Sequence, residues 1–306
     1  MRYSKNCTAL CATMLFSMLP AIAVAQTWSI KTIMGYGLRT PIGVAVDAAG
    51  TMVVGDGYEA RALHRYTLDA SGNYVTQPNV AEGFDFEYVA LDAGGTIYAT
   101  ERSAVHRYKR NGSGVYTRLS DVANTGLTDV EGVAIDTAGR VYVADGATHA
   151  THIYAPNASG GYTQQADLAP GNSDAENSGV AVDIAGNVYV SDSFWRVIHK
   201  YAPDGSGAYT RFADVASGGS FGSLAVDKTG HVYATDNESD TIHHYAPNSS
   251  GGYMQQPAIT AGLLSPYGIA VDAHGAVYIC DTNHARIRKA VSETIFASDF
   301  ESRAPF

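Results

Sequence analysis

The stretch GVAVDIAGNVYVSDSFWRVIHKY, residues 179–201, decides the fold because variants of it occur six times in the chain. An aspartate ends the first segment of every copy, and a glycine follows it three residues later. Successive aspartates lie 44 to 47 residues apart: Asp47, Asp92, Asp136, Asp183, Asp227 and Asp272. A period near 45 residues is typical of a β-propeller or of another repeat array.

Each copy predicts four short strands. The D-x-x-G segment after the first strand predicts a tight turn, because glycine readily adopts positive φ. A second alternating run follows, then a third that ends in His-x-Tyr in five copies, and then a fourth that opens on tyrosine in the same five. Alternating apolar runs between such turns predict antiparallel strands. The sequence therefore predicts an all-β fold, a six-bladed β-propeller of four-stranded antiparallel blades.

The sixth copy lacks the tyrosine of the fourth strand, and the N-terminal segment can replace it. In the other copies this tyrosine precedes the next repeat aspartate by 18 to 21 residues, and Trp28 precedes Asp47 by 19. We therefore predict that residues 28–34, WSIKTIM, form the outer strand of the last blade. The ring is then closed by the N-terminal strand, which leaves no free blade edge.

The ends of the chain differ from the repeats. Residues 1–25 have a basic start at Arg2 and Lys5, an apolar run and an Ala-Val-Ala site, which predict a secretory signal peptide. An uncleaved N-terminal membrane anchor is the alternative. We expect an exported protein, periplasmic or extracellular, with its propeller in residues 26–291 and no membrane span after signal cleavage. Residues 292–306 form a C-terminal tail, either a frayed end or a segment that packs, sorts or interacts.

The charge of the chain argues against two classes of partner, and its cysteine content argues against an internal disulfide. The chain has 30 acidic and 20 basic residues, and two of the basic ones lie in the predicted signal peptide, which leaves a net charge of −12. This balance argues against nucleic acid and against anionic lipid as partners. Cys280 is the one cysteine after the predicted cleavage site, so we expect no internal disulfide.

Candidate site residues fall on loops that vary between copies. In a propeller, the loops that lead into the first strand share a face with those between the second and third strands. Glu87 and Glu131 stand at equivalent places in neighbouring copies, and two close carboxylates bind a cation or share a proton. Asp145 and Asp192 belong to the acids of the second strand and are candidate further ligands; because such an acid recurs in every copy, each is alternatively a cap of its own loop.

The same face carries aromatic and basic candidates for ligand binding. They are Phe194, Trp195, Tyr267, His284 and Arg286. Exposed aromatic side chains beside acids suit contact with a protein, a peptide or a glycan. Alternatively, the aromatic residues of this face plug the channel mouth and the blade tops.

Residues 268–289, GIAVDAHGAVYICDTNHARIRK, resemble the NHL repeat family, whose signature includes the pattern of Asn283, His284, Arg286 and Ile287. The resemblance covers about residues 27–290 and implies a propeller; NHL propellers include binding platforms, nucleic-acid binders and lyases. Glu131-Gly132 is similar to the Glu-Gly of the metal site in gluconolactonase-type propellers. That family also has an asparagine directly before the corresponding glycine of a later blade. Here the residue before Gly179 is Ser178, and Asn177 stands one residue earlier.

Two functions remain open on this sequence. The first is an exported, non-catalytic propeller that binds a partner through its acidic, aromatic loop face. The alternative is a metal-dependent hydrolase or lyase, lactonase-like, with calcium or zinc at the channel mouth and with His284 or Arg286 assisting. The sequence contains no paired-cysteine metal motif and no phosphate loop.

Overall fold

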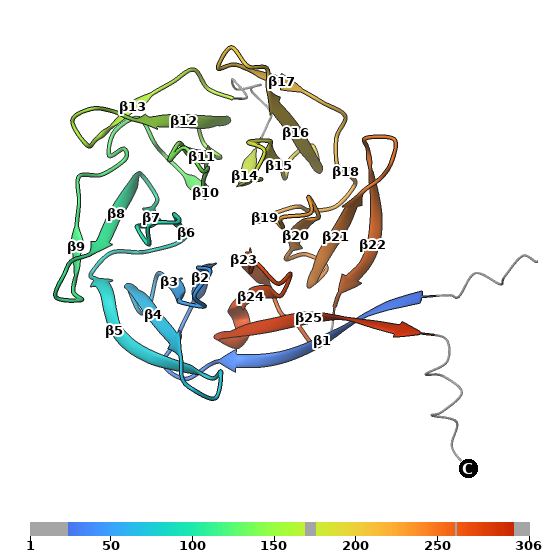
Figure 1. Ribbon diagram of the computed structural model, residues 1–306, viewed down its shortest axis with the longest axis horizontal. Coiled ribbons are helices and arrows are strands. Elements are labelled where there is room, and N and C mark those ends of the chain that lie inside the picture. Colours follow the sequence, from blue (N-terminus) through green and yellow to red (C-terminus); the bar gives the residue numbers. More distant parts are fainter. Residues whose placement is uncertain (1–23, 169–175, 261, 297–306) are drawn as a thin grey trace, which may run out of the picture. The chain divides into compact units, whose positions relative to one another are not determined.

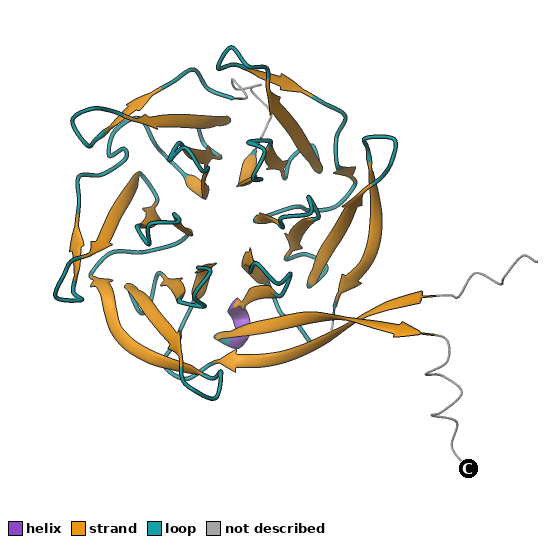
Figure 2. Cartoon of the chain, viewed as in Figure 1, coloured by secondary structure: helices purple, strands orange, loops and turns teal. Residues whose placement is uncertain are grey.

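The computed structural model describes residues 24–168, 176–260 and 262–296. Within these ranges, antiparallel sheets form six blades around a ring, with the first strand of each blade innermost (Figure 1). Figure 2 shows strands and loops almost throughout, with a single short helical turn in the described ranges. The predicted fold class is confirmed.

Each blade contains an inner, a second, a third and an outer strand. The inner strands are β2 (Pro41–Val46), β6 (Val89–Leu91), β10 (Val130–Ile135), β14 (Asn177–Val182), β19 (Leu224–Val226) and β23 (Pro266–Val271). The second strands are β3 (Met52–Asp56), β7 (Ile97–Glu101), β11 (Val141–Asp145), β15 (Val188–Asp192), β20 (Val232–Asp236) and β24 (Val277–Asp281). The third strands are β4 (Ala62–Leu68), β8 (Ala104–Arg110), β12 (Ala150–Pro156), β16 (Val197–Pro203), β21 (Thr241–Pro247) and β25 (Arg286–Phe296). The outer strands are β5 (Tyr74–Glu82), β9 (Tyr116–Arg118), β13 (Tyr162–Gln164), β17 (Tyr209–Arg211), β22 (Tyr253–Ile259) and β1 (Val24–Met34). A strand β18 (Ala216–Ser217) pairs with β16, and a 3-10 helix, η1 (Thr282–His284), precedes β25.

The repeated aspartate, glycine and tyrosine form one unit at the turn between the inner and second strands. In the fourth blade, the Asp183 carboxylate accepts hydrogen bonds from the N–H groups of Ala185 and Asn187, both at 2.9 Å. Gly186 has φ +81° and donates its N–H to the Asp183 carbonyl at 3.0 Å. The Tyr189 hydroxyl donates to the same carboxylate at 3.0 Å. These bonds explain why the three residue types recur at fixed spacing.

Hydroxyl pairs of tyrosine join neighbouring blades. The Tyr189 hydroxyl of the fourth blade lies 3.0 Å from the Tyr253 hydroxyl on the outer strand of the fifth. The equivalent distances are 3.0 Å for Tyr98 and Tyr162, 2.6 Å for Tyr142 and Tyr209, and 3.3 Å for Tyr278 and Tyr74. The outer-strand tyrosine of one blade thus bonds to the second-strand tyrosine of the blade before it.

Strand β1 closes the ring as predicted, by adding to β25 as the outer strand of the sixth blade. Trp28 takes the place of the outer-strand tyrosine: its ring meets Tyr233 of the fifth blade edge-on, with centroids 6.2 Å apart. Its indole N–H donates to the Pro257 carbonyl at 3.0 Å. The strand begins at Val24, earlier than the predicted residue 28 and before the predicted cleavage site.

The histidines of His-x-Tyr link the second strand to the end of the outer strand. His106 Nδ1 lies 2.9 Å from Asp121, and its Nε2 lies 3.5 Å from Glu101. His152 similarly bridges Asp167 and Asp145, at 2.9 and 4.0 Å. Their regular partners within each blade agree with a structural role.

Residues Trp28–Glu293 form one compact unit, which is the propeller. The predicted signal peptide lies outside the described residues except for positions 24 and 25, and so do residues 297–306 of the predicted tail. Residues 292–296 of that tail belong to β25. In the described part of the chain, no helix is long and apolar enough to cross a membrane.

Candidate functional site

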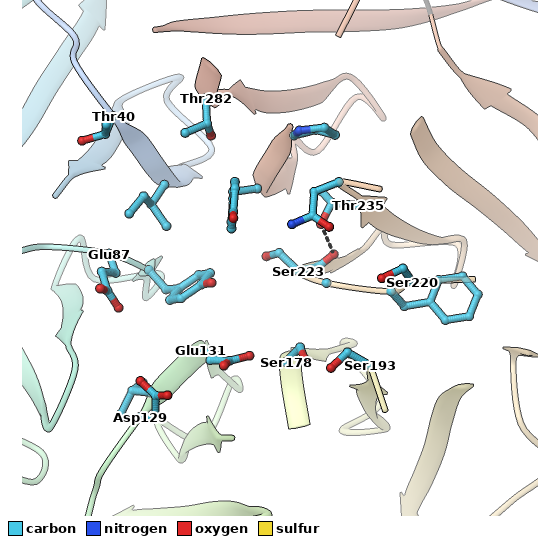
Figure 3. Close-up of a pocket in the computed structure, with 18 of the residues that line it drawn as sticks. Thr40, Glu87, Asp129, Glu131, Ser178, Ser193, Ser220, Ser223, Thr235 and Thr282 are labelled. Atoms are coloured by element: carbon cyan, nitrogen blue, oxygen red, sulfur yellow. Dashed lines mark hydrogen bonds between the residues drawn. The ribbon is translucent and has the colours of Figure 1, made fainter. Parts of the chain in front are cut away.

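A cavity of about 810 Å³ opens at one end of the ring, and all six blades contribute to its lining. Figure 3 shows the side chains of Glu87, Asp129 and Glu131 on one side of this cavity and those of Ser220, Ser223 and Thr235 across it. The cavity is therefore built from the two sets of loops that vary between repeats.

Bulges at the start of the inner strands direct side chains into this cavity. The pairing of β10 with β11 shifts register between Val130 and Gly132, so Glu131 is the extra residue. A bulge leaves such a residue outside the ladder and turns its side chain away from the sheet. The β2, β14 and β23 pairings shift at the same place. The residue at this position lines the cavity in every blade: Ile42, Glu87, Glu131, Ser178, Gly222 and Tyr267.

Acidic residues gather on the side formed by the second, third and fourth blades. Asp85, Asp129 and Glu176 stand two residues before Glu87, Glu131 and Ser178 and form a further acidic row of the lining. The basic side chain in the lining is Arg102, which pairs with Asp129 at 3.1 Å.

Hydroxyl and amide groups form the opposite side. They belong to Ser220, Ser223, Thr235, Asn237 and Asn283. The two sides give the cavity a charged half and a neutral, polar half.

The carboxyl groups of Glu87 and Glu131 are held partly out of water. Burial, together with the charges of Asp129 and Asp85, raises the pKa of Glu87 to about 7 despite a hydrogen bond from Tyr58. Burial, together with the charge of Glu176, raises the pKa of Glu131 to about 7 as well, although a hydrogen bond from Ser178 opposes the shift. Each carboxyl group can therefore gain or lose a proton near neutral pH.

Tyr88 occupies a position that is glycine in four of the six blades. In those blades a side chain would collide with the next blade; a methyl group on Gly268, for example, would lie within 2.8 Å of Gly43 Cα. Tyr88 instead lines both the cavity and a void of about 30 Å³ among the inner strands. Its phenol pKa is raised by burial and by the charges of Glu131 and Glu87.

The structure places Asp145 and Asp192 outside the lining of the cavity. The Asp145 carboxylate is fully buried and accepts the N–H groups of Thr128 and Asp129 at 2.8 and 3.1 Å. The Asp192 carboxylate accepts the N–H groups of Glu176 and Trp195 at 3.2 and 2.9 Å. Both carboxylates thus fix the loops on which lining residues stand.

The predicted ligand-binding residues separate into three positions. Tyr267 lines the cavity. Phe194 and Trp195 form an edge-to-face pair with centroids 5.3 Å apart; they lie outside the lining and are 59% and 52% exposed. His284 and Arg286 both bind the buried Asp281, at 3.0 and 2.7 Å, so they brace the loop before β25 rather than face the cavity.

Several lining residues were not singled out by the sequence analysis. Asp129 and Glu176 could have been identified from the sequence, because both are acids at the same repeat position, two residues before the bulge. Tyr88 is one of the aromatic residues at strand entries on the candidate face, and it also interrupts a position otherwise held by glycine or serine. Arg102 and Tyr58 stand on loops of unequal length, so the repeat gives no alignment that would place them.

The lining offers carboxylates for a divalent cation, but it falls short of a metal centre. Among the described residues, no group of three or more His, Cys, Asp and Glu side chains is close enough to hold a metal ion. Catalytic zinc sites usually have three protein ligands. The residues present therefore do not fit a zinc centre of that kind.

Comparison with known proteins establishes the class of fold: a six-bladed propeller of the kind seen in lyases and lactonases. Virginiamycin B lyase from Staphylococcus aureus is similar, with a TM-score of 0.62, 11% identity and coverage of 87% of this chain and 99% of that one. A gluconolactonase from Xanthomonas campestris is similar, with a TM-score of 0.63, 17% identity and coverage of 86% and 89%.

The likeness extends to a different kind of protein. A chain in the structure of a mitotic checkpoint complex has a TM-score of 0.57, 14% identity and coverage of 95% of this chain and 98% of that one. No known family profile matches the sequence. No curated protein sequence matches it either. At these identities the comparisons define the fold alone, and function has to be argued from the site.

Proposed function

We propose that the protein is a binding propeller whose cavity receives a positively charged group of a protein, peptide or glycan ligand. The observation that carries the proposal is the pair of partly buried carboxyl groups, Glu87 and Glu131, which line one cavity and have pKa values raised to about 7. The basic side chain of the lining, Arg102, is paired with Asp129.

A ligand cation would compensate the burial of these carboxylates. A carboxylate that has lost water is stabilised by an opposite charge within a few ångströms, which also lowers its pKa. Tyr58, Tyr88 and Tyr267 add aromatic faces on which a cation can rest. The hydroxyl and amide groups opposite can bond to the neutral polar part of the same ligand.

Calorimetric titration with matched probes tests this proposal. We expect glucosamine and an arginine-containing tripeptide to bind at pH 7 and to release protons, because the cation lowers the pKa of the carboxyl groups. Glucose, which lacks the amino group, should bind at least about tenfold more weakly, a difference of about 1.4 kcal/mol.

The control is a substitution of an exposed acid on a neighbouring loop. Glu87→Gln/Glu131→Gln should abolish the preference for glucosamine, whereas Glu59→Gln should leave it unchanged, since Glu59 is exposed and lies outside the lining. Equal binding of glucose and glucosamine by the unsubstituted protein would contradict the proposal.

The second candidate function is a hydrolase or lyase of the lactonase-like type. It is favoured by carboxyl groups with pKa near the working pH, which suit general acid–base catalysis. In this candidate, one of Glu87 and Glu131 accepts a proton from the substrate while the other, protonated, donates one. A metal-dependent form would rest on the same two carboxylates, and no step is assigned to a metal because a third protein ligand does not join them among the described residues.

Metal analysis and a turnover screen separate the two candidates. After dialysis against calcium and zinc, the binding propeller should retain no stoichiometric metal and should leave lactones and esters intact. A stoichiometric metal, or turnover, that disappears in Glu87→Gln/Glu131→Gln and persists in Glu59→Gln would establish the enzyme instead.

We also propose that the chain is an NHL-type repeat protein and is exported. The NHL assignment is supported by the match of residues 268–289 to that repeat, and export by the signal-like residues 1–25. Mass spectrometry of protein from the extracytoplasmic fraction should find Gln26 at the N-terminus. Protein retained in the cytoplasm with residues 1–25 attached would contradict export.

A further inference from the structure

An arginine or lysine lies beside a tyrosine at five of the six seams between blades. In the first, second and fourth blades this cation is the residue between His and Tyr of the third strand, and Lys289 holds the same place in the sixth. The third blade has Ile153 at this place, and Arg140 lies 5.8 Å from the Tyr209 ring centroid instead. Arg107 lies 4.8 Å from the Tyr162 ring centroid, and Lys200 lies 5.3 Å from that of Tyr253. Lys289 donates to the Tyr278 hydroxyl at 2.7 Å. These side chains are cations at every physiological pH.

The seam between the fifth blade and strand β1 is different, because the equivalent residue is His244. Its ring is fully buried and stacks on Tyr233 with centroids 4.6 Å apart, while Trp28 meets it edge-on at 5.7 Å. Its Nε2 lies 2.9 Å from His231 Nδ1. Its Nδ1 is buried without a hydrogen-bond partner.

The short contact between the two imidazoles allows one hydrogen between them. One nitrogen must donate and the other must accept, so at least one ring has to be neutral. If both rings were fully protonated, two N–H groups and two positive charges would face each other at 2.9 Å. The contact therefore persists while at least one ring is neutral and becomes repulsive when both rings are protonated.

The groups around His244 do not offset an added proton. The charged groups that act on it are His231, which lowers its pKa, and Asp227, which raises it; burial is the largest effect, and the pKa falls to about 4. Tyr233 on β20 stays protonated because its own pKa is raised by burial. Strand β1 presents the uncharged Trp28, and β22 pairs with β21 through Gln256.

We propose that the seam closed by Trp28 is an acid-sensitive latch, held shut while at least one ring of the His231–His244 pair is neutral and released when both rings are protonated. The neutral form of His244 is favoured in the folded state, so its stabilising contribution is complete above pH 6.5, is lost progressively as the pH falls, and is gone below about pH 4. Release of β1 would expose the edge of β25 and open the ring between the fifth and sixth blades.

Tryptophan fluorescence can test the latch because the chain has two tryptophans, Trp28 and Trp195. In the full chain carrying Trp195→Phe, emission reports on Trp28 alone. We expect a red shift with a midpoint between pH 6.5 and 4, while far-UV circular dichroism keeps its folded value. In His244→Phe, which keeps a stacked ring and takes no proton, the transition should vanish or move down by about one pH unit or more.

Two further variants keep the test decisive. If His244→Phe does not fold at pH 7.5, His244→Gln is used instead. The glutamine amide can form a hydrogen bond with His231, and it does not titrate. His274→Gln removes an exposed histidine from a turn of the sixth blade and should leave the transition unchanged. The latch is refuted by a red shift that persists at the same pH in the His244 variants, by loss of circular dichroism at the same pH, or by constant emission down to pH 4.

Discussion

At the residue scale, the bulge position at the start of each inner strand separates structure from candidate function. The residues around it repeat because they build the blade, whereas this position is Ile42, Glu87, Glu131, Ser178, Gly222 or Tyr267. In the first, third, fourth and sixth blades it is the bulged residue outside the ladder, so the fold places little constraint on its side chain there. The repeat alone places Glu87 and Glu131 at this position in neighbouring copies, but their burial and mutual distance depend on how the ring closes.

Glu131→Gln tests the burial of the carboxyl group. The folded protein binds the Glu131 proton more tightly than the unfolded chain, because the pKa is raised to about 7. Wild-type stability should therefore fall as the pH rises from 4.5 to about 7, and the neutral glutamine should remove that loss. We expect the variant to be more stable by about 1 kcal/mol at pH 8, a value discounted for partial solvation, and equal to wild type at pH 4.5. Urea unfolding at both pH values measures this, and a less stable variant at pH 8 would contradict it.

Gly268→Ala tests the close approach of neighbouring inner strands. The added methyl group would meet the Ile42 carbonyl and Gly43 Cα, which are backbone atoms and cannot rotate away. We expect a loss of about 2–4 kcal/mol, within the range of overpacked buried sites. Ser223→Ala is the matched control, because Ser223 holds the same repeat position in the fifth blade. Thermal melts of the two variants should therefore differ by several degrees.

At the element scale, sequence periodicity predicted the strands well because each strand has the same local reasons to form in every blade. The D-x-x-G turn, the alternating second strand and the outer-strand tyrosine are local patterns, and even the replacement of tyrosine by Trp28 followed from spacing. The cation of the third strand was not recognised, since its partner is a tyrosine on the next blade. Its meaning depends on a contact such as that between Arg107 and Tyr162, which no local pattern contains.

Deletion of residues 26–34 tests strand β1 as the element that closes the ring. The deletion removes the Trp28 contacts with Tyr233, His244 and Pro257 and leaves β25 with an unpaired edge. We expect the melting temperature to fall by about 10 °C or more and the protein to self-associate through the exposed edge. Trp28→Tyr, which introduces the residue found in the other outer strands, should lower the melting temperature by only a small part of this amount. A deletion variant with the wild-type melting temperature would refute the closure.

At the scale of the whole molecule, a closed ring differs from an open repeat array. Each blade of the ring shares a core with two neighbours, as the clusters around Tyr66, Tyr108, Tyr154, Tyr201, Tyr245 and Ile279 show. An open array has two ends from which it can unfold, whereas a ring has none until one seam breaks. We therefore expect the propeller to unfold as one unit at neutral pH.

Single-tryptophan variants can measure this cooperativity. Trp28 reports on the sixth blade in Trp195→Phe, and Trp195 reports on the fourth blade in Trp28→Tyr. At pH 7.5 the fluorescence midpoint of each variant should agree with its own circular dichroism midpoint within about 2 °C, as two-state unfolding requires. Loss of the Trp28 signal well before the circular dichroism signal at this pH would show that the sixth blade unfolds separately.

Strand β1 also imposes an order on biosynthesis. Trp28 is among the first residues of the propeller to leave the ribosome, yet its hydrogen-bond acceptor Pro257 is 229 residues further along the chain, and its sheet partner β25 is later still. Contacts between such distant segments carry a loop-closure cost and slow folding. The strands of blades one to five lie close together in the sequence, but the sixth blade cannot be completed before β25 has been synthesised. Until then β1 remains an extended, unpaired segment that other chains or chaperones can bind.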